Sequence, residues 1–331
     1  MKNKMNKKHI IILSMIVILF SIPYMSPNPY YLIVLINMFV SIMYSSSFRL
    51  VARAGQVTAG HAAFAGIGGY TSALLVTKLQ WNFWYSLPLA GIMTGLIGLG
   101  VGYPSLRLKG IYFAIITFGL GEVVRLIWHS QHDVFGGPGG LTDIPSPNAI
   151  GSWEFGSISS LYLLGLFLTL LTLTVMYMLD KSRFGLILRS IEESDVLGES
   201  IGINTMRYKV LAFFIACFAT GIAGAYFAHQ QHCISPEDFA FLNSAYIIVY
   251  AVVGGLGSVW GPVWGVFVLL GVPVVLRFIP NYNPLIEPLI FGGILVMVML
   301  FLPGGVVTLP EKILSVKNRK LGLKPKGHVD A

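Results

Sequence analysis

Long apolar runs fill most of this chain, and short polar stretches separate them. About ten runs approach the roughly 20 apolar residues that a helix needs to cross a bilayer. Their approximate bounds are 10–25, 30–48, 57–77, 84–102, 110–128, 157–179, 209–229, 240–258, 262–279 and 285–303. The pattern predicts an all-α integral membrane protein, with one transmembrane domain over residues 1–331.

One polar stretch stands out, from Arg183 to Lys209, between the apolar runs 157–179 and 209–229. Apolar residues recur in it at helical spacing, with acids on the opposite face. These positions are Leu188, Ile191, Val196 and Ile201. We expect a short helix over Glu192–Gly202, with Gly202 as its stop. Such a helix would be a docking surface for a soluble partner. The alternative is a solvated connecting loop with no binding role, and the composition of the stretch is compatible with either.

The basic residues sort to one side when every run crosses the membrane and the N-terminus lies inside. The inside set is Lys2, Lys4, Lys7, Lys8, Arg49, Arg53, Arg107, Lys109, Lys181, Arg183, Arg189, Arg207, Lys209, Lys312, Lys317, Arg319, Lys320, Lys324 and Lys326. Lys78 and Arg277 fall outside, and Arg125 falls within a run. Because cytoplasmic loops carry an excess of Lys and Arg, both termini are predicted to be cytoplasmic.

Composition supports a membrane protein, since 55% of the residues are hydrophobic and 11% are charged. A soluble domain has about 25% charged residues. The net charge of +8 would suggest nucleic acid in a soluble protein, but here the topology explains it. The first run could be a signal peptide, yet Ser21–Tyr24 is a poor cleavage site, so a retained helix is expected. The basic tail 311–331 is expected to be solvated.

The sequence carries little sign of catalysis. It contains no GxxxxGK[ST] phosphate loop, no GxSxG and no HExxH motif. An enzyme is therefore disfavoured, and the chain itself is expected to bind no cofactor. If it moves a solute uphill, ATP hydrolysis must occur in another subunit, or an ion gradient must drive transport. A secondary transporter would couple ions through Glu122 or Asp180.

Two glycine-rich segments occupy related positions in the two halves of the chain, which indicates a pseudo-repeat. They are Gly55–Tyr70 and Gly254–Gly265, and each follows one apolar run and opens another. Tight helix packing explains any single glycine, whereas interrupted helices in corresponding halves indicate a transport path. The predicted path residues are Gly55, Gln56, His61, Glu122, Arg125, Gly254, Gly255 and Gly257.

The remaining polar groups have alternative readings. Glu122 and Arg125 share a helix face. They could line the transport path, or they could form a structural ion pair. The pairs His129/His132 and His229/His232 could meet in a metal site, but ordinary interfacial histidines are favoured and no metal is predicted. Cys217 and Cys233 are predicted to be unpaired, because a helix between them would hold them too far apart.

Several long motifs carry a family resemblance. The run R-x-I-x-E-x-D-V-x-x-E-S-I-G-I-N (Arg189–Asn204) resembles the ATPase-docking loop of bacterial ABC-transporter permeases for branched-chain amino acids, of the LivM type. Leu197, Gly198 and Ser200 stand where the family usually has alanine. The segments GQVTAGHAAFAGIGGYTSALL, LRLKGIYFAIITFGLGEVVR, GGPGGLTDIP, ISPEDF and GGLGSVWGP are similar too, in order and spacing over about Gly55–Gly265.

The resemblance implies a permease subunit in the bacterial inner membrane. Its implied partners are a second, homologous permease, two ATPase subunits that use ATP and Mg, and an extracytoplasmic binding protein. The implied substrates are branched-chain or other small hydrophobic amino acids, although similar permeases carry urea or short amides. The predicted docking residues are Glu192, Glu193, Asp195, Leu197, Gly198, Glu199 and Gly202.

Overall fold

The computed structural model is all-helical in the residues that it describes, which are 19–23, 28–108, 110–151, 153–200, 202–277, 283 and 286–309. The helices are α2 (Pro29–Arg53), α3 (His61–Thr77), α4 (Phe83–Ser105), α5 (Ile111–Ser130), α6 (His132–Phe135), α7 (Ile158–Lys181), α8 (Arg183–Glu193), α9 (Asp195–Ser200), α10 (Thr205–Gln231), α11 (Phe241–Gly254), α12 (Gly261–Leu276) and α13 (Glu287–Phe301). Short 3-10 helices are η1 (Gly137–Gly139), η2 (Pro236–Phe239) and η4 (Val306–Thr308).

Five helices in the described residues are long and apolar enough to cross a membrane: α2, α4, α5, α7 and α10. The apolar helices α11, α12 and α13 are shorter. This confirms a multi-pass membrane protein, while the count of ten crossings and the pseudo-repeat stay predictions. Most of the run 10–25, Lys109 and the tail 311–331 lie outside the described residues.

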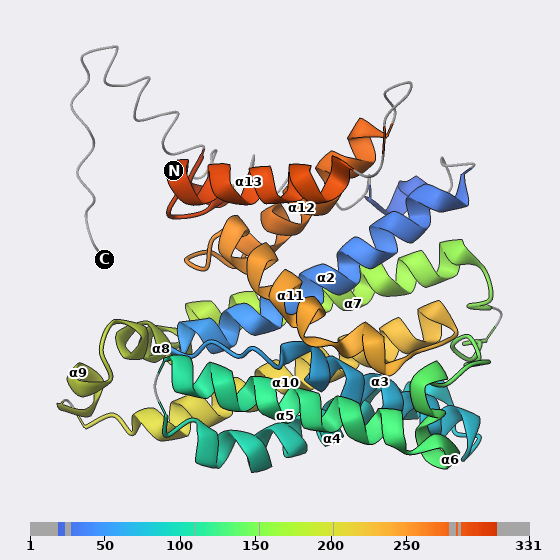
Figure 1. The fold of residues 1–331 in the computed structure, drawn as a ribbon, viewed down its shortest axis with the longest axis horizontal. Coiled ribbons are helices and arrows are strands. Elements are labelled where there is room, and N and C mark those ends of the chain that lie inside the picture. The colour runs from blue at the N-terminus through green and yellow to red at the C-terminus, as the bar shows by residue number, and fades with distance from the viewer. Residues whose placement is uncertain are drawn as a thin grey trace.

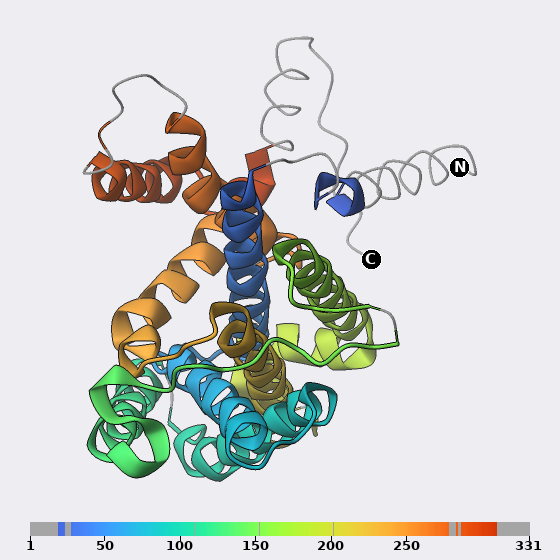
Figure 2. The same ribbon diagram turned by 90° about the vertical axis from the view of Figure 1, so that its right-hand side faces the viewer.

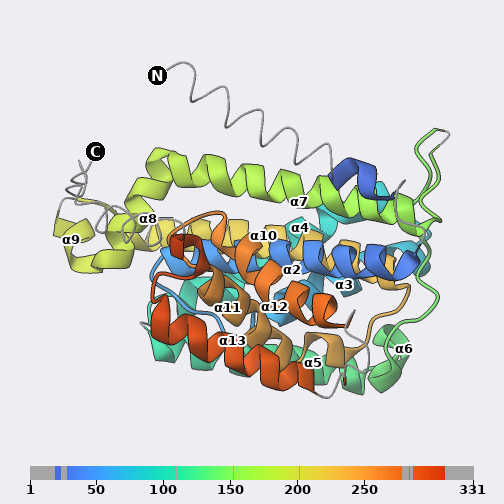
Figure 3. The same cartoon turned by 90° about the horizontal axis from the view of Figure 1, so that it is seen from above.

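The long helices define two ends of the molecule. Figure 1 shows α8 and α9 at one end and α6 at the other, and Figure 3 shows the same arrangement from above. We call these the α8 end and the α6 end. The basic residues at the α8 end are Arg49, Arg53, Arg107, Lys181, Arg183, Arg189, Arg207 and Lys209. The predicted grouping of basic residues on one side therefore matches the fold.

The helix α10 is the centre of the bundle and packs against α2, α3 and α4. Small residues allow its close contact with α3. A Cβ atom added at Gly224 would lie 1.9 Å from Ala65 O, and one added at Gly68 would lie 2.2 Å from Gly221 O. Membrane helices gain contact area when small residues let their backbones approach. The helices α11 and α12 pack on α2, and α13 packs on them, away from α4 and α5 (Figure 2).

The start of α3 differs from the predicted run 57–77. The helix α2 continues to Arg53, and residues 54–60 then run inward without helical structure before α3 begins at His61. Gln56 and Thr58 are buried in this stretch. Irregular backbone at membrane depth is tolerated only where protein or a water-filled cavity surrounds it. The interruption thus places the N-terminus of α3 inside the bundle.

Candidate functional site

The segment between α7 and α10 forms two helices, so the prediction of one helix over Glu192–Gly202 is wrong. The helix α8 ends at Glu193, Ser194 is extended, and α9 begins at Asp195. Serine at a helix cap followed by an acid in the first turn favours a new helix start. The predicted apolar stripe is divided as well, because Val196 is 68% exposed.

A network of ion pairs fastens α8 to the bundle. Leu188 and Ile191 are buried beneath it. Arg49 Nη2 lies 3.0 Å from Asp180 Oδ1, and Arg189 Nη2 lies 3.1 Å from Asp180 Oδ2. The Asp180 carboxylate therefore joins α2, α7 and α8. We call Arg49, Asp180 and Arg189 the arginine–aspartate cluster.

A second ion pair joins α8 to α2, between Arg53 Nη1 and Glu192 Oε2 at 2.6 Å. Burial raises the pKa of the Glu192 carboxyl above its ordinary value, although the guanidinium of Arg53 opposes this effect. Removal of water from a carboxylate disfavours its charged form. Sequence reasoning missed the pairs that Arg49 and Arg53 form, because each joins residues far apart in the chain.

Polar contacts also hold α9 in place. Lys209 Nζ lies 2.7 Å from Asp195 Oδ1, and Thr205 Oγ1 donates to Glu199 Oε1 at 2.9 Å. Glu199 was predicted as a docking residue, and in the structure its carboxylate is bound to the Thr205 hydroxyl at the start of α10. Gly202 has a φ of 82°, a conformation that glycine adopts without strain, as the predicted sharp turn requires.

The other predicted docking residues lie around this segment. Gly198 and the backbone of Leu197 belong to α9, and the side chain of Leu197 lies outside the described part. Glu193 is exposed and lines a groove of about 260 Å³ with Glu192 and Asp195. Gly55 and Gln56 line the same groove. The structure thus brings these two predicted path residues to the α8 end, away from His61.

His61 lies at the start of α3, and its side chain is buried. Its Nε2 is 2.9 Å from Ser47 Oγ and 2.9 Å from Thr220 Oγ1, and those two hydroxyls are 2.8 Å apart. The three side chains come from α2, α3 and α10. They hold the interrupted helix against the centre of the bundle, so the predicted path residue His61 is packed and hydrogen-bonded.

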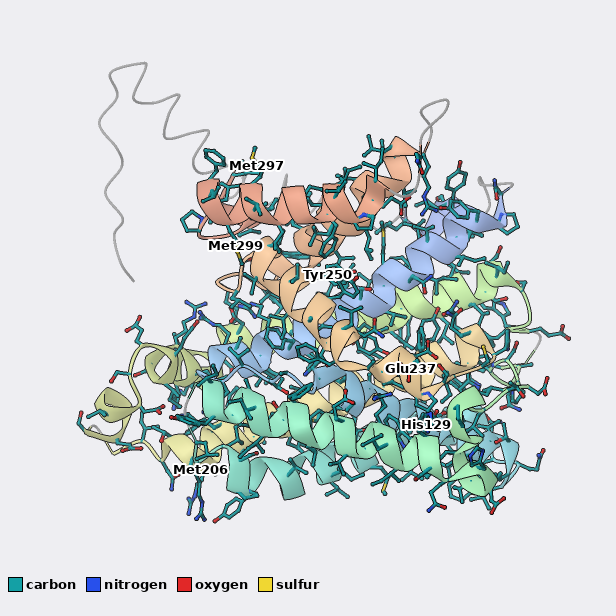
Figure 4. The ribbon with its side chains drawn as sticks, viewed as in Figure 1. His129, Met206, Glu237, Tyr250, Met297 and Met299 are labelled. Atoms are coloured by element: carbon teal, nitrogen blue, oxygen red, sulfur yellow. The ribbon has the colours of Figure 1, made fainter. Side chains whose placement is uncertain are left out.

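Glu122 and Arg125 form the predicted pair on α5, with Arg125 Nε 2.9 Å from Glu122 Oε2. A third residue, Glu237 of η2, lies 2.7 Å from Arg125 Nη1. Figure 4 labels Glu237 beside α5. The cluster ties η2 to α5 and is partly exposed, with Arg125 at 21% and Glu237 at 66%.

Gly254, the last residue of α11, and Gly255, which follows it, pack against backbone. A Cβ atom at Gly254 would lie 1.8 Å from Gly261 O, and one at Gly255, whose φ is 109°, would lie 2.5 Å from Gly304 O. Gly257 has open space around it. Arg49 Nε donates to Leu256 O at 2.8 Å, so the arginine–aspartate cluster also holds this turn.

His229 and His232 are each held by their own hydrogen-bond partners. His229 is buried, with Nε2 3.0 Å from Ser72 Oγ and Nδ1 2.7 Å from Pro145 O. His232 Nδ1 lies 2.9 Å from Ile144 O. The described residues contain no group of three or more His, Cys, Asp or Glu that could hold a metal ion. The thiols of Cys217 and Cys233 are both free.

A cavity of about 200 Å³ lies between α2, α3, α10, α11 and η2. Its lining combines apolar side chains with Asn37, Tyr44, Asp238 and Asn243. Sequence reasoning missed these polar residues. Asp238 lies in the ISPEDF segment, which was the one available signal, whereas the others stand alone in apolar runs.

Comparison with known proteins agrees with this architecture. A family described as "Branched-chain amino acid transport system / permease component" matches residues 30–302. The high-affinity branched-chain amino acid transport system permease protein LivM of Escherichia coli (strain K12) is 32% identical over 291 residues, which cover 81% of this chain and 68% of the relative. LivM of Salmonella typhimurium (strain LT2) is 30% identical over 334 residues, which cover 94% and 78%.

A more distant relative is the autoinducer 2 import system permease protein LsrC of Salmonella paratyphi B, 27% identical over 242 residues that cover 69% of this chain and 67% of LsrC. No solved structure matches this chain. The family match spans most of the chain, from the start of α2 to the end of α13. The chain therefore belongs to the family of branched-chain amino acid transport system permease components.

Proposed function

We propose that this chain is the membrane-spanning permease subunit of a bacterial ABC importer for branched-chain or other small hydrophobic amino acids. ATP and Mg would be used by two separate ATPase subunits. A second, homologous permease would complete the membrane path, and an extracytoplasmic binding protein would deliver the substrate. Family membership supports the importer, and the names of the LivM relatives support the substrate class.

The observation that carries the proposal is the attachment of α8 and α9. Both helices lie beyond the ends of α7 and α10 (Figure 3), yet the ion pairs of Asp180, Glu192 and Asp195 hold them to the bundle. A docked helix passes on an ATPase movement only if its own attachment is stiff. These contacts supply that stiffness, and Val196 and Glu193 stay exposed for a partner.

The positions of basic residues support the orientation. They concentrate at the α8 end, and such residues favour the cytoplasmic side of a membrane. We therefore place the α8 end in the cytoplasm, where the ATPases would bind, and the α6 end outside. Both termini would then be cytoplasmic, in the inner membrane. Reporter fusions after Asp180 and after His232 should give cytoplasmic and external signals, respectively.

The degree of similarity to known relatives supports the proposed substrate class. The LivM relatives, at 30–32% identity, are more similar to the chain than LsrC of Salmonella paratyphi B, at 27% identity. LsrC shows that related permeases have other substrates, as its name states autoinducer 2 import. Uptake assays should compare leucine, isoleucine and valine with urea, a short amide and autoinducer 2.

The deciding experiment is reconstitution of the permease in liposomes with and without its ATPases and binding protein. ATP-dependent leucine uptake is expected only from the complete assembly. Uptake by this chain alone, driven by an ion gradient, would support a secondary transporter instead. Glu193→Arg should weaken co-purification of the ATPase, because it reverses an exposed charge at the contact. Glu154→Arg is the matched control, an exposed acid in the loop before α7.

A further inference from the structure

The cavity beside α3 has two chemically different walls. Asp238 and Tyr246 are exposed and form its accessible side. Val40, Ala62 and Ile247 are buried and form an inner apolar wall. The volume of about 200 Å³ suits a molecule smaller than a drug-sized ligand, and the two walls suit one charged end and one aliphatic end.

The polar groups on the accessible side are held in fixed positions. Asp238 Oδ2 accepts from Ser235 N at 2.7 Å and from Ser235 Oγ at 3.0 Å, so its carboxylate cannot turn freely. Asn243 Nδ2 donates to Asp238 O at 2.9 Å. These bonds engage the donor group of Asn243 and leave its carbonyl oxygen as an acceptor. A carboxylate and an amide carbonyl together suit a substrate ammonium.

A donor for an anionic group also lines the cavity. Tyr44 lines the cavity, and its buried hydroxyl has no hydrogen-bond partner among the residues that the structure describes. A buried unpaired hydroxyl costs free energy unless a ligand satisfies it. The first turn of α3 reaches the cavity at Ala62, but the Ala62 N–H already donates to Ser244 Oγ at 2.9 Å, so the Tyr44 hydroxyl is the unpaired donor.

We propose that this cavity is an amino-acid binding site within the permease, on the path of the transported solute. Asp238 and Asn243 would bind the ammonium group, and the Tyr44 hydroxyl would bind the carboxylate. The aliphatic side chain would then lie on the inner wall formed by Val40, Ala62 and Ile247. This assignment rests on the proposed import of amino acids and adds a site of selection inside the membrane subunit.

The first test is uptake by the complete reconstituted importer. Asp238→Asn keeps an acceptor for Ser235 but removes the charge, so leucine uptake below saturation should fall by about tenfold or more, the effect of one charged hydrogen bond. Glu154→Gln is the matched control, an exposed acid that does not line the cavity. Tyr44→Phe should also lower uptake, whereas Tyr85→Phe, at an exposed position, should not. Membrane abundance and ATPase capture should stay unchanged in all four variants.

A second test needs no change to the binding groups. Ser41 lines the cavity, so Ser41→Cys should react with a small maleimide and should be protected by leucine. Cys233→Ser removes the exposed native thiol, and the buried Cys217 can remain. A cysteine at the exposed position Glu154 controls for general effects of leucine and should stay unprotected.

The outcomes separate the two proposals. If the wild-type assembly shows no ATP-dependent leucine uptake, the proposed function is wrong and the site assignment fails with it. If the wild type transports leucine while Asp238→Asn and Tyr44→Phe transport equally well, the site assignment alone is wrong. Should the variants fail to accumulate, protection at Ser41→Cys decides, and its absence overturns the site.

Discussion

The arginine–aspartate cluster offers the sharpest test of how α8 is attached. The side chain of Arg49 is only 3% exposed and that of Asp180 only 12%. Arg49 bonds both the Asp180 carboxylate and Leu256 O, which lie at the ends of different helices. We expect Asp180→Asn to be strongly destabilising, because it leaves the Arg49 charge buried without its partner.

The magnitude follows from this burial. Breaking a buried ion pair by removing one partner costs about 3–5 kcal/mol. At about 1.4 kcal/mol for each factor of ten, the ratio of folded to unfolded protein should fall by roughly 10² to 10³ or more. Arg189, at 45% exposure, can reorient into water and adds little to the loss.

The double variant Arg49→Met with Asp180→Leu should be less damaging than Asp180→Asn alone. It removes both buried charges, and the main remaining cost is the unpaired Leu256 carbonyl, about 1–3 kcal/mol. The assay is thermal unfolding of the detergent-purified permease, in which size-exclusion chromatography measures the folded protein that remains after heating. Arg207→Met is the control, since Arg207 is exposed at the same end. Wild-type stability of Asp180→Asn, or a double variant worse than that single one, would refute the reasoning.

Three further predictions concern other parts of the fold. Arg125→Gln should reduce membrane abundance more than Glu122→Gln, because it leaves the acids Glu122 and Glu237 facing each other, whereas Glu122→Gln leaves the Arg125–Glu237 ion pair intact. Quantitative immunoblots test this, and equal abundance of the two variants would contradict it. Gly202→Leu should weaken ATPase co-purification more than Gly202→Asn, because asparagine tolerates a positive φ better than leucine does; equal capture by both would show that the turn is unimportant. Gly224→Ala should destabilise the α3–α10 contact by about 1–3 kcal/mol in thermal unfolding, whereas Gly119→Ala, which has open space, should change little; similar melting of both would contradict the packing.

The division into helices and the family could be predicted from the sequence. Apolar runs and their polar boundaries predicted the positions of most helices. An apolar segment lies in lipid, where its backbone N–H and C=O groups find no water, and a helix pairs them within the segment. The charged stretch Arg183–Lys209 was recognised because it interrupts the apolar runs with residues that favour water. Its internal break at Ser194 was missed, since the apolar spacing across the break fits one continuous helix equally well.

The candidate site depended on contacts between residues distant in the chain. Arg49 appeared in the sequence as one of many basic residues after an apolar run, and only the fold brings it to Asp180 and to Leu256 O. Gly55 and Gln56 were predicted on the path, but residues 54–60 turn back into the bundle and leave both beside α8.

Local pattern thus determined where this chain forms apolar helices and which stretch between them is polar. The partners of each buried charge and the location of the cavity were decided by tertiary structure alone. The physical reason is that apolar periodicity records how a segment meets lipid or water, which is a local property. A cavity wall or a buried ion pair such as Arg49–Asp180 instead depends on how α2, α3, α7 and α11 are arranged around α10.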